Sequence, residues 1–420
     1  MDLTRRHFIQ ASAIGTSAAL LAPRYVFSTA SAPPANDVLV VIFQRGAMDC
    51  LQAVVPYADA DYARHRPTIK IPQPGAANGV LPLDNFFGFH PSLAPLLPLF
   101  KSGRLGVVHA TGLKHDERSH FECQTHLESA MIDHTMHTGW LNRHVGNVGV
   151  KGSFQAIGMG SSLQMSLQGS QPAIGMSSVA SFSFTSSSSR KRQLEDTLYA
   201  LSPAANLSAT SARQALDAVD YFAVANPAQY TVENAAIYPT TSFGTQLKEV
   251  AQIIKSGVGV QMACVDIGGW DHHSGIVAAL PPLLDELAKG LLAFNTDLGN
   301  AMNRVTVITM TEFGRRVKEN ASGGTDHGAG SSMFLMGGAV NGGKVYSEWP
   351  GLADSKLFNG DLDVTTDYRT VLNELMHKRA QDGNAQAQFP GFTPGPWLGC
   401  FKKGNLGTFD SIKPPKPVYT

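Results

Sequence analysis

The sequence predicts an α/β fold in which helices cover both faces of a mostly parallel sheet. Short, continuously apolar runs alternate with longer amphipathic segments, which is the pattern of buried parallel strands joined by helices. Each of these runs is followed by a cluster of polar residues. Because ligands collect at the carboxyl ends of parallel strands, we expect these clusters to meet in one composite site.

The predicted strands and helices alternate along the chain. Two early strands are predicted at Val38–Phe43 and Leu105–Ala110, and two later ones lie in the stretches GVQMACVDIGGW and RVTVITMTEFGRR. Helices are predicted at Thr241–Lys255, Leu280–Leu298 and Tyr368–Lys378. We find no P-loop and no GxGxxG nucleotide fingerprint among the loops.

The composition predicts one large globular domain over residues 33–420 with an insert. The chain has 420 residues, of which 43% are hydrophobic and 16% charged, so it can bury a substantial core. A serine-rich stretch that ends in a basic run predicts a mobile loop opening a largely helical insert over residues 177–239. Basic and acidic residues both total 33, so no overall field draws the chain to nucleic acid or anionic lipid.

The first 32 residues resemble a twin-arginine (Tat) export signal. Arg5 and Arg6 precede an apolar stretch from Ala11 to Ala22, and Ala30 and Ala32 have the spacing of a cleavage site. The apolar stretch is short for a spanning helix, so we expect cleavage after Ala32, with an uncleaved anchor as the alternative. The Tat translocase is thus an expected partner during export. The expected location is periplasmic or extracellular.

The four cysteines are scattered along the chain without CxxC spacing. This spacing disfavours a cysteine-built zinc or iron-sulfur site. We expect most of them to be buried as small hydrophobic residues, although a disulfide is permitted in an exported protein. The sequence does not choose among the pairings.

Two acidic and histidine-rich loops are candidates for metal binding. Asp271 and His273 follow the third predicted strand and can point to one side of an extended turn, which would leave His272 structural or hydrogen-bonded to a ligand. Asp326 and His327 lie in the glycine-rich stretch SGGTDHGAG, where backbone can approach a ligand closely. The alternative interpretation of each loop is a polar turn with hydrogen-bonded side chains.

Four further residues are candidates for catalysis. Ser119 precedes a predicted helix, where its hydroxyl could act as a nucleophile or simply cap the helix in a capping box with Glu122. Arg45 and Arg315 could clamp a phosphate or sulfate in bidentate fashion, or form surface salt bridges. Glu312 could be a metal ligand, a general acid or base, or the residue that orients a ligating histidine.

Five motifs in order carry a resemblance to a known family. RGAMDCL, RSHFECQ, GGWDHH, TEFGRR and GGTDHG, behind a twin-arginine leader, resemble the DUF1501 family of exported bacterial proteins, which is grouped with the alkaline phosphatase and sulfatase superfamily. The resemblance implies an alkaline-phosphatase-like fold and two divalent metal ions. Asp326 and His327 would hold one ion, and Asp271 with His273 the other. It further implies Asp49 as a ligand after the first strand and Ser119 as the nucleophile.

These observations predict an exported, metal-dependent hydrolase of phosphate or sulfate esters. Zinc suits the mixed oxygen and nitrogen ligands, with manganese, calcium and iron as alternatives. The sulfatase signature Cys-x-Pro-x-Arg is absent around Cys123, which disfavours a formylglycine mechanism. One alternative is a non-catalytic exported protein of the same fold that acts in surface assembly or polymer binding. Another is a metal-assisted activity on glycans or lipids.

Overall fold

The computed structural model describes five long segments of the chain. They cover residues 37–132, 137–149, 154–182, 218–380 and 382–403, and a few further positions between 190 and 216 are also described. The predicted export signal lies outside the described residues, and so do residues 183–189, 198–215 and four single positions between them and residue 218 of the predicted insert. Within the described part of the chain, no helix combines the length and the apolar character that crossing a membrane requires.

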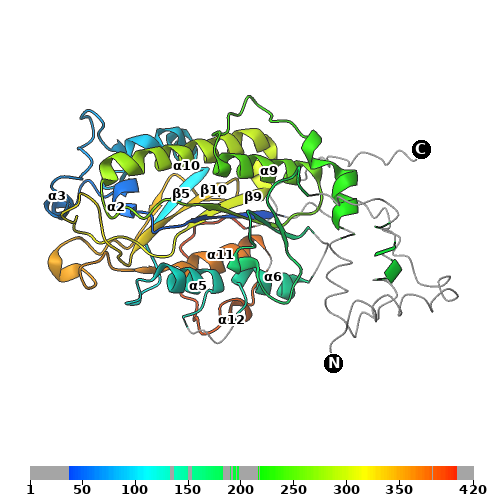
Figure 1. Cartoon of the computed structure of the whole chain (residues 1–420). Coiled ribbons are helices and arrows are strands. Elements are labelled where there is room, and N and C mark those ends of the chain that lie inside the picture. The colour runs from blue at the N-terminus through cyan, green and yellow to red at the C-terminus, as the bar shows by residue number, and fades with distance from the viewer. Residues whose placement is uncertain are drawn as a thin grey trace.

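A mixed, mostly parallel sheet of nine strands forms the centre of the protein (Figure 1). Its strands lie in the order β11-β5-β10-β9-β1-β8-β6-β7, and β12 pairs with β5 beside this path. The strands are β1 (Val38–Gln44), β5 (Leu105–Gly112), β6 (Ala156–Met159), β7 (Ile174–Met176), β8 (Met262–Ile267), β9 (Val305–Met310), β10 (Ser331–Gly337), β11 (Val345–Tyr346) and β12 (Thr366–Asp367). A smaller antiparallel sheet contains β2 (Val54–Val55), β4 (Gly88–Phe89) and β3 (Leu81–Pro82).

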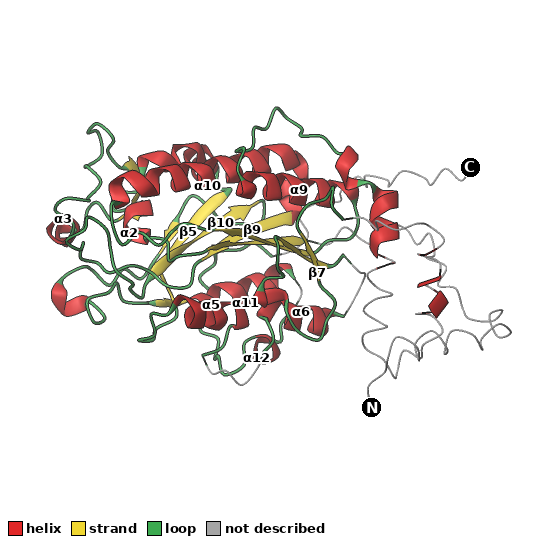
Figure 2. Cartoon of the chain, viewed as in Figure 1, coloured by secondary structure: helices red, strands yellow, loops and turns green. Residues whose placement is uncertain are grey.

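Helices cover both faces of the large sheet, as the sequence predicts (Figure 2). The helices α9 and α10 lie on one face, and α5, α6, α11 and α12 lie on the other. The α-helices are α2 (Cys50–Ala53), α3 (Ala60–His65), α4 (Leu97–Lys101), α5 (His120–Ser129), α6 (Trp140–Val148), α9 (Ser242–Ser256), α10 (Ile276–Leu298), α11 (Tyr368–Arg379) and α12 (Ala385–Gln388).

The central strand β1 shows why this sequence folds into a two-sided sheet. All seven residues of VLVVIFQ are buried. Side chains alternate along a strand, so Val40 and Ile42 enter the core beneath α9 and α10, whereas Val41 and Phe43 enter the core beneath α5 and α11. A strand buried on both faces needs a continuous apolar run, and this run predicted the strand correctly.

The helix α10 begins earlier than the sequence predicts. The prediction starts at Leu280, but the structure starts the helix at Ile276. The amides of Gly275 and Ile276 donate to the carbonyls of Ser322 and Gly323, at 3.1 and 2.9 Å. The start of the helix is therefore stabilised by a loop distant in sequence, which local pattern cannot reveal.

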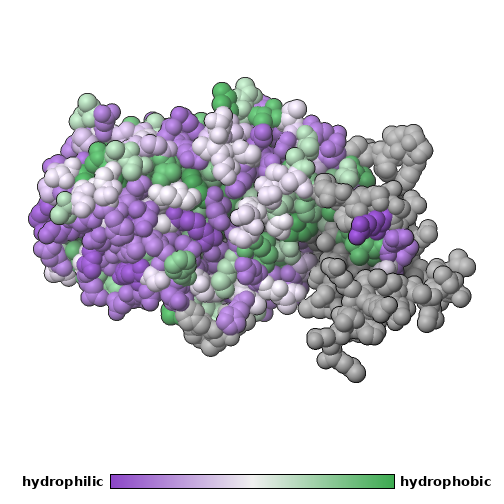
Figure 3. All heavy atoms as spheres, in the orientation of Figure 1, coloured by the Kyte–Doolittle hydropathy of each residue, from purple (hydrophilic) through white to green (hydrophobic). Residues whose placement is uncertain are grey.

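One reversed strand brings the predicted polar loops together. β10 runs antiparallel to β9 and β5, whereas the other pairs in the large sheet are parallel. The residues before β10 therefore lie at the same edge as those that follow β1, β5, β8 and β9. This edge lies toward α2, at the end of the molecule where hydrophilic residues dominate the face shown in Figure 3.

Candidate metal centre

Three histidines and one aspartate converge at the carboxyl edge of the sheet. Donor atoms of His120, Asp271 and His327 all lie within 4.8 Å of one another. His273 joins them, with its Nε2 at 3.1 Å from Asp271 Oδ1 and 2.9 Å from His327 Nε2. The four residues come from the loop after β8, the loop before β10 and the first turn of α5. They form the cluster that we call the His3Asp cluster.

A hydrogen bond from Nδ1, the ring nitrogen that faces away from the cluster, fixes the orientation of His327. Its Nδ1 lies 2.9 Å from the backbone carbonyl of Arg118. A carbonyl oxygen only accepts hydrogen bonds, so Nδ1 carries the proton and Nε2 of the neutral ring keeps its lone pair. That lone pair faces Asp271, whose Oδ1 is 3.3 Å away. Burial lowers the pKa of His327 and favours this neutral form.

His120 has the same arrangement with a different acceptor. Its Nδ1 donates to Glu312 Oε1 at 2.7 Å, which raises the pKa of His120. Glu312 is buried, and it also accepts from the Gln124 side chain at 3.0 Å and the Gly46 amide at 2.8 Å. Burial alone would raise the pKa of Glu312, but these donors lower it and keep the carboxylate ionised. Nε2 of His120 is buried and faces Asp271 Oδ2 at 3.4 Å, with no hydrogen-bond partner among the described residues.

His273 completes the pattern at the more exposed side of the cluster. Its Nδ1 lies 3.1 Å from Asp326 Oδ1, and a carboxylate again fixes the proton on Nδ1. Asn320 donates to the same oxygen at 3.0 Å, and together with His273 it lowers the pKa of Asp326. Asp326 therefore orients His273, and its Oδ1 is already occupied by two donors.

Asp271 remains ionised beside the three imidazoles. Partial burial opposes its charge, but the Arg315 guanidinium, whose Nη2 donates to Oδ1 at 2.5 Å, and the neighbouring histidines lower the pKa of Asp271 to about 2. Its carboxylate is thus an anion over the whole neutral range. Oδ1 faces His273 and His327, and Oδ2 faces His120.

With the ring protons placed on Nδ1, a positive charge at the centre of this arrangement would remove a repulsion between its donor atoms. Each imidazole donates outward through Nδ1 and directs an Nε2 lone pair toward a carboxylate, and lone pairs at 2.9 to 3.4 Å repel one another. A shared proton or a divalent cation removes this repulsion. Zinc binds imidazole nitrogen at about 2.0–2.1 Å, which gives roughly 3.3 Å between tetrahedral donors. The donor spacing fits such an ion, and outward hydrogen bonds from Nδ1 are typical of metal-ligating histidines.

Glycines allow the loop before β10 to approach the cluster. A Cβ on Gly324 would lie 2.3 Å from the backbone carbon of His273, and one on Gly328 would lie 2.4 Å from the backbone carbon of Arg315. Neither position has room for a side chain. The glycines of this stretch thus permit the close backbone approach that the sequence suggests, and they bring His327 to Asp271.

The two arginines predicted to clamp an anion have other partners. The guanidinium of Arg315 is buried and donates to the carbonyls of Ala47, Thr325 and Gly46 as well as to Asp271. These partners use Nε, Nη1 and Nη2 of the guanidinium, and the predicted clamp of an anion by Arg315 stays a prediction. Arg315 holds three loops together and keeps Asp271 ionised.

Arg45 also has partners within the protein, and they form the salt bridges that were the predicted alternative to an anion clamp. It pairs with Glu128 at 2.6 Å and Asp266 at 3.0 Å, and its guanidinium lies 3.9 Å from the ring centroid of Phe43. Nε, Nη1 and Nη2 all donate to these two carboxylates. The contacts agree with the salt-bridge alternative for Arg45, and its role as a clamp for phosphate or sulfate stays a prediction.

Asp49 is not part of the His3Asp cluster. Its carboxylate is buried and accepts two hydrogen bonds from Arg66 at 2.9 Å and one from the Thr325 hydroxyl at 2.9 Å. It also accepts from the amides of Leu51 and Gln52 and caps α2. Both oxygens thus accept hydrogen bonds in a buried ion pair with Arg66, and the role of Asp49 as a metal ligand stays a prediction.

Ser119 stands at the start of α5 without capping it. Its side chain makes no capping hydrogen bond, and its amide donates to Glu117 Oε1 at 2.6 Å. The predicted capping box with Glu122 is therefore wrong. The half-buried hydroxyl lies one residue before His120, and its role as a nucleophile stays a prediction.

Sequence reasoning missed His120 as a candidate ligand. The sequence analysis assigned a chemical role to the neighbouring Ser119 and none to His120. The available signal was a histidine in the first helical turn after a strand, combined with a buried glutamate after another strand. Glu312 accepts a hydrogen bond from His120, as one of its three predicted roles requires, and the binding of a metal by His120 stays a prediction.

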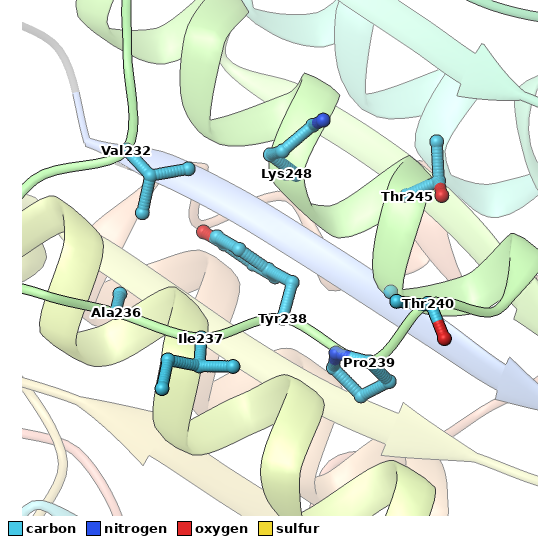
Figure 4. A pocket seen from close by; sticks show the side chains of 9 residues that line it. Val232, Ala236, Ile237, Tyr238, Pro239, Thr240, Thr245 and Lys248 are labelled. Atoms are coloured by element: carbon cyan, nitrogen blue, oxygen red, sulfur yellow. The ribbon is translucent and has the colours of Figure 1, made fainter.

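A surface pocket lies away from this cluster (Figure 4). Tyr238 lies across its floor, and Lys248 of α9 borders it. The lining contains no histidine, cysteine, aspartate or glutamate, and comprises Val232, Ala236, Ile237, Tyr238, Pro239, Thr240, Gly244, Thr245 and Lys248. This lining offers none of the side chains that usually bind metal ions, in contrast to the His3Asp cluster.

Comparison with known proteins identifies the family. The family model described as "Protein of unknown function (DUF1501)" matches residues 36–381. The chain belongs to the DUF1501 family. A search of the curated proteins and a search of the solved structures each found no match. The matched DUF1501 region contains every residue of the His3Asp cluster and the residues that orient it.

Proposed function

We propose that this DUF1501 protein is an exported, metal-dependent hydrolase of phosphate or sulfate esters with an alkaline-phosphatase-like fold. One observation carries the proposal. Three imidazoles, each with Nδ1 fixed by an acceptor, direct Nε2 toward the ionised carboxylate of Asp271. Such a donor set is costly without a cation and is suited to one.

His120, Asp271 and His327 would hold the ion, with His273 as a fourth ligand. Three nitrogens and one oxygen suit zinc, iron or manganese, whereas calcium prefers an all-oxygen shell. When bound, a divalent ion of this kind polarises an ester oxygen and lowers the pKa of a nearby hydroxyl. We propose one ion here instead of the two that the family resemblance implies, because His273 and His327 share Asp271 as their partner.

Ser119 is the proposed nucleophile. Its hydroxyl makes no capping bond and is adjacent in sequence to the proposed ligand His120. The amides in the first turn of α5 lack partners within the helix, and a helix N-terminus favours an anionic group. Attack by the Ser119 oxygen on phosphorus or sulfur would break the bond to the leaving alcohol. Hydrolysis of the seryl ester would then release phosphate or sulfate.

A second candidate is a non-catalytic, metal-binding protein that acts outside the cytoplasm in surface assembly or polymer binding. The engagement of both arginines favours it. Arg45 pairs with two carboxylates, and Arg315 pairs with Asp271 and donates to backbone carbonyls, so both already have partners that compete with a transferred anionic group. In this function the ion would stabilise the loops around α5, and Ser119 would have no chemical role.

Elemental analysis of the purified protein, followed by an ester screen, separates these functions. The hydrolase proposal expects ion-dependent turnover of an aryl phosphate or aryl sulfate, loss of both ion and turnover in His327→Gln, and loss of turnover alone in Ser119→Ala. An ion in the His3Asp cluster without any turnover supports the binding function. A folded protein that takes up no zinc, iron or manganese contradicts both.

The proposed export has its own test. Replacement of Arg5 and Arg6 together by lysine should retain the protein in the cytoplasm, because the twin-arginine pair is the recognised feature of this signal. Cell fractionation and immunoblotting measure the distribution. An unchanged periplasmic fraction in the double variant would refute the Tat route.

A further inference from the structure

A second group of side chains of metal-ligating types flanks Ser119 in the sequence. Donor atoms of His115, Cys123 and His126 lie within 4.8 Å of one another. Cys123 and His126 are buried, and His115 is half-buried. The imidazole rings of His115 and His126 form an edge-on contact with centroids 5.4 Å apart. None of the three belongs to the His3Asp cluster.

The fold positions these three side chains on one helix and the loop before it. Cys123 and His126 are three residues apart in α5, so they lie on the same face of the helix. His115 comes from the loop between β5 and α5. Arg118 fixes this loop, because its Nη1 donates to the His115 carbonyl at 2.7 Å and its Nη2 pairs with Asp361 at 2.5 Å.

Two contacts of the group, one made by Cys123 and one by His115, can be exchanged for bonds to an ion. The thiol of Cys123 donates to the Glu117 carbonyl at 3.5 Å, a weak bond. His115 Nδ1 accepts from the Glu117 amide at 3.1 Å. Coordination would replace the hydrogen bond of the Cys123 thiol by a bond to the metal. Rotation of the His115 ring would break the hydrogen bond from the Glu117 amide. Both losses fall on the backbone of Glu117, an exposed residue that water can reach.

We propose that His115, Cys123 and His126 form a second metal site, with one thiolate and two imidazoles for a zinc-class ion. Binding forms one metal–sulfur bond, breaks the S–H bond of Cys123 and releases that proton to solvent, with no change in oxidation state. Thiolate and imidazole ligands select zinc or copper over calcium and magnesium. The three residues leave a fourth tetrahedral position for water.

Occupancy of this site would fix the segment that carries the proposed nucleophile. Ser119 lies between His115 and Cys123, and the carbonyl of Arg118 in the same segment orients His327. An ion that ties the loop to α5 would therefore hold both groups in place. The metal assignment itself does not depend on the hydrolase proposal.

Cobalt spectroscopy distinguishes this site from the His3Asp cluster. We would remove bound metal from the purified protein with a chelator and then titrate in Co²⁺. The readout is the near-ultraviolet charge-transfer band that only a thiolate ligand produces. The band should appear in the wild type. It should disappear in Cys123→Ser and persist in His327→Gln, which removes a ligand of the other cluster. The matched control Cys264→Ser, which removes another buried cysteine, should retain it.

Several results would overturn the proposal. They are absence of the band in the folded wild type, its persistence in Cys123→Ser, or its loss in a folded Cys264→Ser. If Cys123→Ser does not fold, X-ray absorption of the zinc-loaded wild type replaces it. A sulfur neighbour at about 2.3 Å supports the site, and a shell of nitrogen and oxygen alone contradicts it. Loss of the ion from the His3Asp cluster leaves the sulfur signal intact, so failure of one proposal is distinguishable from failure of the other.

Discussion

Glu312 offers the sharpest test of the His3Asp cluster, because it acts on the ion only through His120. Its Oε1 accepts from His120 Nδ1, the Gln124 side chain and the Gly46 amide at 2.7 to 3.0 Å. Glu312→Gln keeps the shape of the side chain but removes the negative charge that makes His120 a stronger donor to a cation. Loss of such a carboxylate behind a ligating histidine lowers metal affinity by about 10- to 100-fold. This factor corresponds to about 1.4 to 2.7 kcal/mol of binding free energy.

The assay is a competition titration of zinc against a chromophoric chelator. It should be done in the Cys123→Ser background, so that only the His3Asp cluster contributes. Glu348→Gln is the matched control, because it makes the same chemical change at an exposed carboxylate. A folded Glu312→Gln variant whose zinc affinity stays within about twofold of the control would refute the orienting role and weaken the metal assignment.

Three further predictions follow from the described contacts. Arg66→Met leaves the buried Asp49 carboxylate without its ion-pair partner, so urea unfolding should show a loss of about 3–5 kcal/mol, and a loss below about 1 kcal/mol would contradict the pairing. Burial lowers the pKa of His109 to about 4 from its usual 6.5, so the stability it contributes is complete above pH 6.5 and is lost, up to about 3 kcal/mol, as pH falls toward 4. Urea midpoints between pH 7 and pH 4.5 should depend less on pH in His109→Gln, and an equal slope would exclude His109 as the source. Ser119→Ala should lower ester turnover by at least about 100-fold with unchanged zinc content, and full turnover would remove Ser119 from the nucleophile role.

The sequence predicted the central strands well because their burial is a local property. Val38–Phe43 is a continuous apolar run and Leu105–Ala110 is apolar except for His109, and both become strands buried on two faces. The helix predicted at Thr241–Lys255 is also confirmed within one residue, with the side chain of Thr241 accepting from the Gly244 amide. Periodicity and capping residues can be recognised within short stretches of sequence, so these elements could be predicted without tertiary information.

The roles of charged residues could not be predicted from short stretches of sequence. Arg45 finds its partners 83 and 221 residues away, at Glu128 and Asp266, and His120 finds Glu312 at a separation of 192. An arginine after a strand looks the same in sequence whether it holds a ligand or a carboxylate. Its role depends on which segments the fold brings to it, and that information is absent from local pattern.

The reversal of β10 decides how the polar loops combine. If β10 ran parallel to β9, the residues before it would lie at the opposite edge of the sheet, far from Asp271 and His120. Because it is antiparallel, the loop from β9 to β10 stays at one edge and brings Glu312, Asp326 and His327 to the same place. The motif TDHG therefore has chemical meaning only in this topology.

The charges around the cluster argue for a single divalent ion. With the three histidines neutral, the carboxylates of Asp271, Glu312 and Asp326 and the guanidinium of Arg315 leave a net charge of −2. One divalent cation neutralises this set, whereas two would leave an excess of positive charge at a partly buried site, which is unfavourable without further anions. A phosphate or sulfate ester would supply such an anion, so a second ion, if it binds, should bind together with substrate. Zinc stoichiometry measured with and without a non-hydrolysable phosphonate should therefore be one and then at most two at the cluster. Two ions bound to the protein alone in the Cys123→Ser background would contradict this charge argument.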